Sequence, residues 1–270
     1  MRLLVFGLGY TAKAFVRRLE PAWTVTGTSR IGDAGSFRFD REHRLPAAAF
    51  DGVTHLLVSV PPDEAGDPTL DAHGADIAAL KGLQWLGYLS TTGVYGTRDG
   101  GWVDEGSELR PTSARAERRA AAEQGWLKLG AHVFRLAGIY GPGRSVFDTL
   151  RAGGAKRTDA GGQVFSRIHV DDIATVLLAS IARPRPGAIY NVCDGEPAAQ
   201  EAVVAHAASL LSMAAPPLVP LAEAELSPMA RSFWADNKRV SNALIKRELG
   251  VVLAYPSYRE GLAAVLAAGG

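Results

Sequence analysis

The glycine-rich loop near the start of the chain constrains the fold more than any other feature. A short apolar run, Leu3–Phe6, leads directly into Gly7-Leu8-Gly9-Tyr10-Thr11-Ala12, which opens a predicted helix over 11–19. In such a strand–loop–helix unit the first glycine permits a tight turn and the second lets the backbone approach a pyrophosphate. The small Ala12 allows the helix to pack closely on the strand. The loop therefore predicts a dinucleotide-binding site in an α/β chain.

Short apolar runs alternate with helical patterns through the first half of the chain. After the first strand and helix, the sequence predicts strands over 23–28, 37–39, 53–60, 84–89 and 132–136, and helices over 69–81 and 113–129. This alternation indicates a parallel sheet covered by helices on both faces. We therefore predict an α/β fold of the Rossmann type, with a doubly wound parallel sheet.

The alternation loosens after Gly141. One further strand is predicted over 188–192, among helices over 170–181, 196–211, 240–249 and 257–267. We expect residues 1–165 to form the dinucleotide-binding core. Residues 166–270 are expected to add the last sheet elements and a small substrate-side lobe that does not fold independently.

The charge balance gives no reason to expect nucleic acid or a membrane as a partner. The 270 residues carry a net charge of +1 with a pI of about 7.9, and no apolar run approaches the roughly 20 residues of a membrane span. The single Cys193 excludes an internal disulfide and fits a reducing compartment. The first residues do not resemble a signal peptide. We expect a cytoplasmic monomer or homodimer with a small-molecule ligand and no metal site.

The end of the second predicted strand bears on the choice of dinucleotide. Its sequence is Thr26-Gly27-Thr28-Ser29-Arg30, about 20 residues after the glycine loop. An acidic residue here would bind the adenosine ribose of NAD, but the first acidic residue, Asp33, comes later. Ser29 and the planar guanidinium of Arg30 suit a 2′-phosphate instead. The sequence therefore favours NADP over NAD.

Three further motifs agree with the glycine loop. They are Ser90-Thr91-Thr92-Gly93-Val94-Tyr95-Gly96, the stretch from Arg135 to Gly143, and Ile168-His169-Val170-Asp171-Asp172-Ile173-Ala174. Taken in this order, the four motifs resemble the NAD-dependent epimerase/dehydratase family, the extended branch of the short-chain dehydrogenases/reductases. The resemblance runs from the first residue to about 195. Because the chain is short for that branch, it is similar to the atypical members.

The resemblance implies roles for individual residues. Thr91 takes the position of the catalytic Ser or Thr of the family, and Asp40 that of its adenine-contacting Asp. The implied cofactor-binding residues are Gly7, Gly9, Tyr10, Thr11, Ala12, Ser29, Arg30, Asp40, Ser59, Val60 and Arg119. The implied substrate-side residues are Thr92, Tyr95, Tyr140, Arg144, Phe165, Arg167 and Trp234.

Several of these side chains have an alternative structural interpretation. The hydroxyls of Thr91 and Thr92 would also satisfy backbone groups at a strand end. Tyr95 and Tyr140 would serve as packing residues with a polar tip. His169 stands at a helix start, where a capping role is expected.

The resemblance also shows that the family's proton donor is absent from its expected position. The family carries a Tyr, and a Lys four residues later, on the helix after its fifth strand. Here the lead-in Pro111-Thr112-Ser113-Ala114 and the later Glu123 align with that helix, and they place Arg115 and Arg119 at the two positions. A guanidinium keeps its proton at any working pH, so Arg115 cannot replace the Tyr, whereas Arg119 can still bind a ribose.

Two functions follow from this departure. In the first, the chain is an atypical reductase, epimerase or dehydratase that acts on a small polar or sugar-like substrate, with its proton supplied by Thr91, Tyr95, Tyr140 or water. In the second, the chain binds NADP without catalysis, having lost the Tyr and Lys. The long C-terminal segment favours the enzyme.

Overall fold

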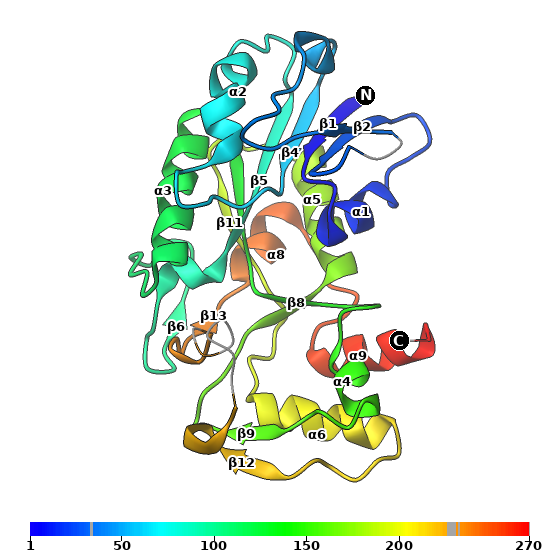
Figure 1. The fold of residues 1–270 in the computed structure, drawn as a ribbon, viewed down its shortest axis with the longest axis vertical. Helices are drawn as coiled ribbons and strands as arrows, with labels where there is room; N and C mark the ends of the chain where they lie inside the picture. Colours follow the sequence, from blue (N-terminus) through cyan, green and yellow to red (C-terminus); the bar gives the residue numbers. More distant parts are fainter. Residues whose placement is uncertain (33–34, 226–230, 232, 270) are drawn as a thin grey trace.

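Seven parallel strands form the central sheet (Figure 1). The computed structural model describes residues 1–32, 35–225, 231 and 233–269. The strand order is β11-β7-β5-β4-β1-β2-β3, and it runs outward in both directions from the β1–β4 pair. The predicted doubly wound α/β fold is therefore confirmed, with its topological switch point at the carboxyl ends of β1 and β4. The strands are β1 (Arg2–Phe6), β2 (Thr24–Ser29), β3 (Ser36–Arg38), β4 (His55–Val58), β5 (Trp85–Thr91), β7 (His132–Leu136) and β11 (Ile189–Val192).

Helices cover both faces because each central strand is apolar on both faces. Leu3 and Val5 of β1 belong to one buried cluster, while Leu4 and Phe6 belong to another on the opposite face. The first cluster is completed by α1 (Tyr10–Val16), α5 (Val170–Ala182) and α8 (Ala243–Leu249), and the second by α2 (Pro68–Ala78) and α3 (Ala114–Lys128). Burying each such side chain contributes roughly 1.5–3 kcal/mol.

A smaller lobe lies beyond the carboxyl ends of the strands (Figure 1). It has an apolar core of its own, in which Phe147, Ala207 and Leu262 are almost fully buried. Its helices are α4 (Val146–Arg151), α6 (Gln200–Leu210) and α9 (Tyr258–Ala267). Three short parallel pairs lie outside the central sheet: β8 (Gly138–Tyr140) with β10 (Arg167–His169), β9 (Arg157–Asp159) with β12 (Leu218–Pro220), and β6 (Trp102–Val103) with β13 (Arg239–Val240).

The chain passes between the two parts more than once. Helix α4 and strand β9 precede residue 165, yet they contact α6 in the lobe, while α5 and β11 follow it and belong to the main body. The described residues also include three short 3₁₀ turns: η1 (Ala47–Phe50), η2 (Thr92–Tyr95) and η3 (Leu221–Glu223). Within the described ranges, no helix has the length and apolar character needed to cross a bilayer.

Candidate functional site

The glycine loop has the geometry of a pyrophosphate-binding turn. Gly7 has φ +85°, and a Cβ there would meet the Val60 side chain at 3.0 Å, so only glycine fits on both counts. A Cβ on Gly9 would meet nothing within 4 Å, which leaves the space beside that backbone open. The loop is held by Thr28, whose hydroxyl accepts a hydrogen bond from Gly7 N at 2.9 Å. The sequence motif did not single out Thr28.

The side chains predicted to bind the adenosine end of the cofactor differ in the contacts that they already make within the protein. Arg30 is exposed at the end of β2, and the half-buried Ser29 accepts a hydrogen bond from Gly32 N at 3.0 Å. Asp40 is held by the protein, since its Oδ1 lies 2.6 Å from His43 Nδ1 and its Oδ2 accepts from Arg38 Nε at 3.3 Å. The hydrogen bond with His43 lowers the pKa of Asp40 to about 2. A contact between Asp40 and adenine stays a prediction.

A cavity of about 560 Å³ opens at the carboxyl ends of β4, β5 and β7. Its walls come from the sheet edge, from the start of α3 and from the lobe. It brings together ten of the side chains singled out in the sequence: Thr11, Ser59, Thr91, Thr92, Arg115, Arg119, Arg144, Phe165, Arg167 and Trp234. The open α/β sheet thus presents its cavity where such folds bind ligands.

Thr91 has the two roles that the sequence left open. It lines the cavity, and its hydroxyl also accepts a hydrogen bond from Gly93 N at 3.1 Å at the start of η2. Thr92 lines the cavity as well and is 9% exposed. The backbone bond occupies only one lone pair of the Thr91 oxygen, so the hydroxyl can still donate to a ligand.

Two arginines one turn apart on α3 face the cavity. Arg115 is exposed near the ring of Phe233, whereas Arg119 is 9% exposed. Nη1 of Arg119 donates to the Leu89 carbonyl at 2.8 Å and to the Tyr88 hydroxyl at 3.1 Å. These bonds hold the guanidinium in place at the end of β5, so Arg119 is a fixed cation rather than a mobile one.

Tyr95 does not reach the cavity. Its ring is fully buried, and its hydroxyl donates to Asn191 Oδ1 at 2.8 Å and accepts from Arg135 Nη1 at 2.8 Å. Burial also raises the pKa of this hydroxyl. Arg135 in turn forms a buried ion pair with Glu123 at 2.7 Å, which ties α3 to β7. The structure therefore gives Tyr95 a place in a core network, and its predicted part in proton transfer has no geometric support.

Tyr140 lines a second hollow together with Val203 and Leu262 of the lobe. Its hydroxyl donates to the Ser257 carbonyl at 3.4 Å, and its ring contacts His169 edge-on. Burial raises the pKa of Tyr140 well above its usual range. His169 caps α5 as expected, accepting from Asp171 N at 3.2 Å. Tyr10 lies nearby, donates to the Pro142 carbonyl at 3.1 Å and does not line the main cavity.

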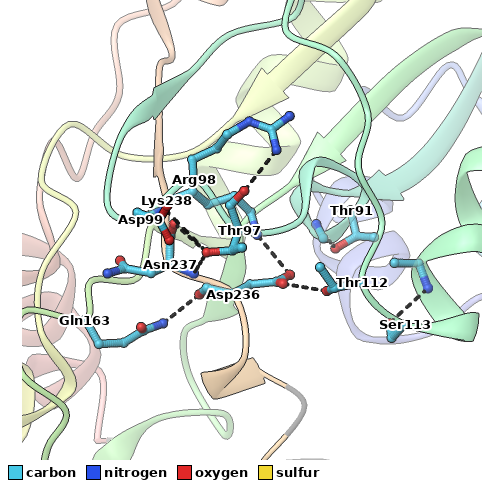
Figure 2. A network of polar contacts seen from close by, with 12 residues as sticks. Thr91, Thr97, Arg98, Asp99, Thr112, Ser113, Gln163, Asp236, Asn237 and Lys238 are labelled. Carbon is cyan, nitrogen blue, oxygen red and sulfur yellow. Dashed lines mark hydrogen bonds and ion pairs between the residues drawn. The ribbon is translucent and has the colours of Figure 1, made fainter.

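Two charged residues in the cavity wall were not singled out in the sequence. Asp236 and Lys238 line it, with Lys238 Nζ 3.1 Å from Asp236 Oδ2 (Figure 2). Their segment follows the Pro-rich connection after α6. The stretch Asn237-Lys238-Arg239-Val240 resembles the start of the family's late substrate-lobe helix, but this resemblance gave neither Asp236 nor Lys238 a role. Only the fold brings this segment beside the ends of β5 and α3.

The cavity is strongly cationic. Four arginines line it, together with Lys238, and Asp236 is the only carboxylate among the described lining residues. The arginines are Arg115, Arg119, Arg144 and Arg167. A wall with this balance favours an anionic ligand.

The fold and the cavity define the class of protein: an α/β protein with the fold of the NAD-dependent epimerases and dehydratases. The dTDP-glucose 4,6-dehydratase of Bacillus anthracis str. Ames, solved in complex with NAD, has a TM-score of 0.76 at 17% identity and covers 99% of this chain and 96% of its own. The human epimerase family protein SDR39U1 (isoform 2), solved with NADPH, has a TM-score of 0.75 at 17% identity. The match covers 98% of this chain and 99% of the human chain. At these identities the likeness shows the fold alone.

A nearer relative places the chain in a family. A functionally unknown conserved protein from Silicibacter pomeroyi DSS is 52% identical, with 99% of each chain covered and a TM-score of 0.92. The chain belongs to the same family as this protein. No family model matches the chain, and no curated protein matches it.

Proposed function

We propose that the protein binds NADP and uses the cavity to reduce or epimerise a small, anionic, sugar-like substrate. The lining of the cavity carries this proposal, because it joins the cofactor side of the sheet to the lobe. Thr11 and Ser59 lie on the cofactor side. Phe165, Arg167 and Trp234 lie on the lobe side. A volume of about 560 Å³ suits a small ligand beside the reactive end of a dinucleotide.

The residues around the glycine loop fit a dinucleotide. The positive φ of Gly7 and the open space beside Gly9 leave room for a pyrophosphate against the backbone. Ser29 and the exposed Arg30 would hold the 2′-phosphate that distinguishes NADP from NAD. Arg119 would bind the nicotinamide ribose. When bound, the dinucleotide would supply or accept a hydride.

The charge of the cavity supports an anionic substrate. Arg115 and Arg144 are exposed in the wall and free to bind a carboxylate or phosphate in the forked geometry of a guanidinium. Arg167 is instead engaged with the Phe165 and Ala198 carbonyls, at 2.8 and 2.9 Å. It would shape the wall more than bind the ligand.

A noncatalytic NADP-binding protein is the second candidate. Arg115 and Arg119 favour it, because they stand where the resembled family carries its Tyr and Lys. In this case the cavity would hold an anionic ligand, and the dinucleotide would stabilise the fold without reacting.

The test begins with binding and continues with turnover. NADPH and NADH are titrated by calorimetry, and the NADPH-saturated protein is then mixed with carbonyl compounds that carry a carboxylate or phosphate, and with nucleotide sugars. Loss of NADPH absorbance measures reduction, and mass spectrometry detects redox-neutral products. Turnover of an anionic substrate supports the enzyme. Saturation with NADPH and no product across the panel supports the noncatalytic protein, and failure to bind either dinucleotide contradicts both.

A further inference from the structure

The cavity wall offers few groups that can release a proton. Among its described residues there is no Tyr, His, Cys or Glu side chain. Its arginines keep their protons at any working pH, and its Ser and Thr hydroxyls are too weakly acidic to donate unaided. The groups that remain are the ammonium of Lys238 and the carboxyl of its partner, Asp236.

Lys238 is built into the wall rather than extending from the surface. It is 8% exposed, and its Nζ lies 3.1 Å from Asp236 Oδ2. The other carboxylate oxygen of Asp236 accepts from the Thr112 hydroxyl at 2.6 Å, just before the start of α3 (Figure 2). The pair is thereby linked to the helix that carries Arg115 and Arg119.

Two separate segments hold the backbone around Lys238. The Asn237 carbonyl accepts from Arg98 N at 2.8 Å and from Gly100 N at 3.1 Å. On the other side, Gln163 Nε2 donates to the Asp236 carbonyl at 2.6 Å. These bonds hold the backbone that carries Lys238, and the ion pair with Asp236 holds its amine, as proton transfer requires.

The electrostatic surroundings of the amine favour release of a proton. Burial lowers the pKa of Lys238, the nearby Arg98 lowers it further, and Asp236 acts in the opposite direction. Arg115, Arg119 and Arg167 line the same cavity. An amine in a buried cationic site gives up its proton at a lower pH than an exposed lysine.

We propose that Nζ of Lys238 is the proton donor and acceptor of this cavity, with Asp236 as the residue that positions it. This inference rests on the proposed function. During carbonyl reduction, the dinucleotide, when bound, would supply the hydride by giving up one of its own C–H bonds. A C–H bond would form at the carbonyl carbon as the C=O π bond breaks toward oxygen. The oxygen takes a proton from Lys238 Nζ, so one O–H bond forms and one N–H bond breaks. The substrate gains two electrons from the nicotinamide dinucleotide, and the neutral amine regains its proton from water.

The first experiment needs no substrate. The chain contains six lysines, and incorporation of lysine labelled with ¹³C at Cε lets each titration be followed by NMR from mild acid to high pH. Lys238→Arg identifies the signal of Lys238, and Lys246→Arg, which changes an exposed lysine on α8, is the matched control. We expect Lys238 to titrate at a lower pH than the exposed lysines and to shift when NADPH binds. Titration together with the exposed lysines would overturn the proposal.

The second experiment uses the carbonyl substrate that the panel identifies. Lys238→Met and Lys238→Arg should each lower kcat by about 10²–10⁴-fold, because the arginine keeps the charge but cannot release the proton. The high-pH limb of kcat should fall at the pH at which Lys238 titrates by NMR. In Asp236→Asn that limb should move to lower pH with a smaller loss of kcat, and Lys246→Arg should behave as the parent chain.

The outcomes separate the two proposals. Parent-like kcat and pH dependence in Lys238→Arg would overturn the role of Lys238 while leaving the reductase intact. If the parent chain turns over nothing, the proposed function fails, and the role of Lys238 in catalysis fails with it.

Discussion

Arg30 is the residue on which the proposed preference for NADP depends. It is exposed at the end of β2, where its guanidinium can bind a 2′-phosphate in a charge-assisted hydrogen bond. Such bonds contribute about 1.5–3 kcal/mol, so Arg30→Ala should weaken NADPH roughly 10- to 100-fold and leave NADH almost unchanged. Calorimetric titration of both dinucleotides measures this ratio. Arg247→Ala, an exposed arginine on α8, is the control, and an unchanged ratio in Arg30→Ala would remove the basis for choosing NADP.

Individual residues also show which parts of the candidate site could be predicted from the sequence. The glycine loop was predictable because its neighbours in sequence are its neighbours in space. The place of Tyr95 was not, because its partner Asn191 lies 96 residues away. Lys238 was missed for the same reason, since its surroundings come from segments near residues 98, 112 and 163.

At the scale of elements, the glycine loop provides a test with a matched control. Gly7 and Gly52 both have positive φ, +85° and +66°, but only at Gly7 would a Cβ meet a neighbour closer than 3.4 Å. An alanine at either position should cost about 1–2 kcal/mol in unfolding free energy because of the backbone conformation. Only Gly7→Ala should also abolish NADPH binding, because it alters the turn at the pyrophosphate. Urea unfolding and calorimetry report the two effects, and NADPH binding by Gly7→Ala at parental affinity would contradict the loop's role.

The ion pair between α3 and β7 provides a second test at this scale. Glu123 and Arg135 are 0% and 3% exposed, so removing one partner leaves an uncompensated buried charge. Glu123→Ala should lower the free energy of unfolding by about 3–5 kcal/mol. The exposed pair of Glu108 and Arg110 is the comparison, and Glu108→Ala should cost about 0–1 kcal/mol. Equal losses in urea unfolding would show that burial does not govern the strength of this pair.

The elements themselves divide into those that sequence patterns could predict and those they could not. The long helices carry apolar periodicity, and most strands of the central sheet are short apolar runs. Their predicted positions agree with the structure to within a few residues. Strands such as β6 and β13 have two residues each, and β6 pairs with a segment more than 130 residues away. Two residues hold no periodicity, so these strands are determined only by the folded chain.

At the scale of the whole molecule, Asp194 links the sheet to the lobe and should make stability depend on pH. It follows β11, its backbone N donates to the Arg167 carbonyl at 2.7 Å, and its Oδ2 is buried without a hydrogen-bond partner among the described residues. Burial raises the pKa of this carboxyl from 3.8 to about 7. The folded chain therefore holds a proton at pH values where the unfolded chain has released it.

The sign of the effect follows from proton linkage. Below about pH 4 both states are protonated, and between about pH 4 and 7 only the unfolded state loses its proton, so the free energy of unfolding falls as pH rises. Asp194→Asn has no proton to lose at this position and keeps the acceptor for Glu196 N. Relative to the parent, it should therefore gain about 1–3 kcal/mol between pH 4 and pH 8. Urea unfolding at several pH values measures the difference, and parallel curves for the two chains would show that Asp194 ionises equally in both states.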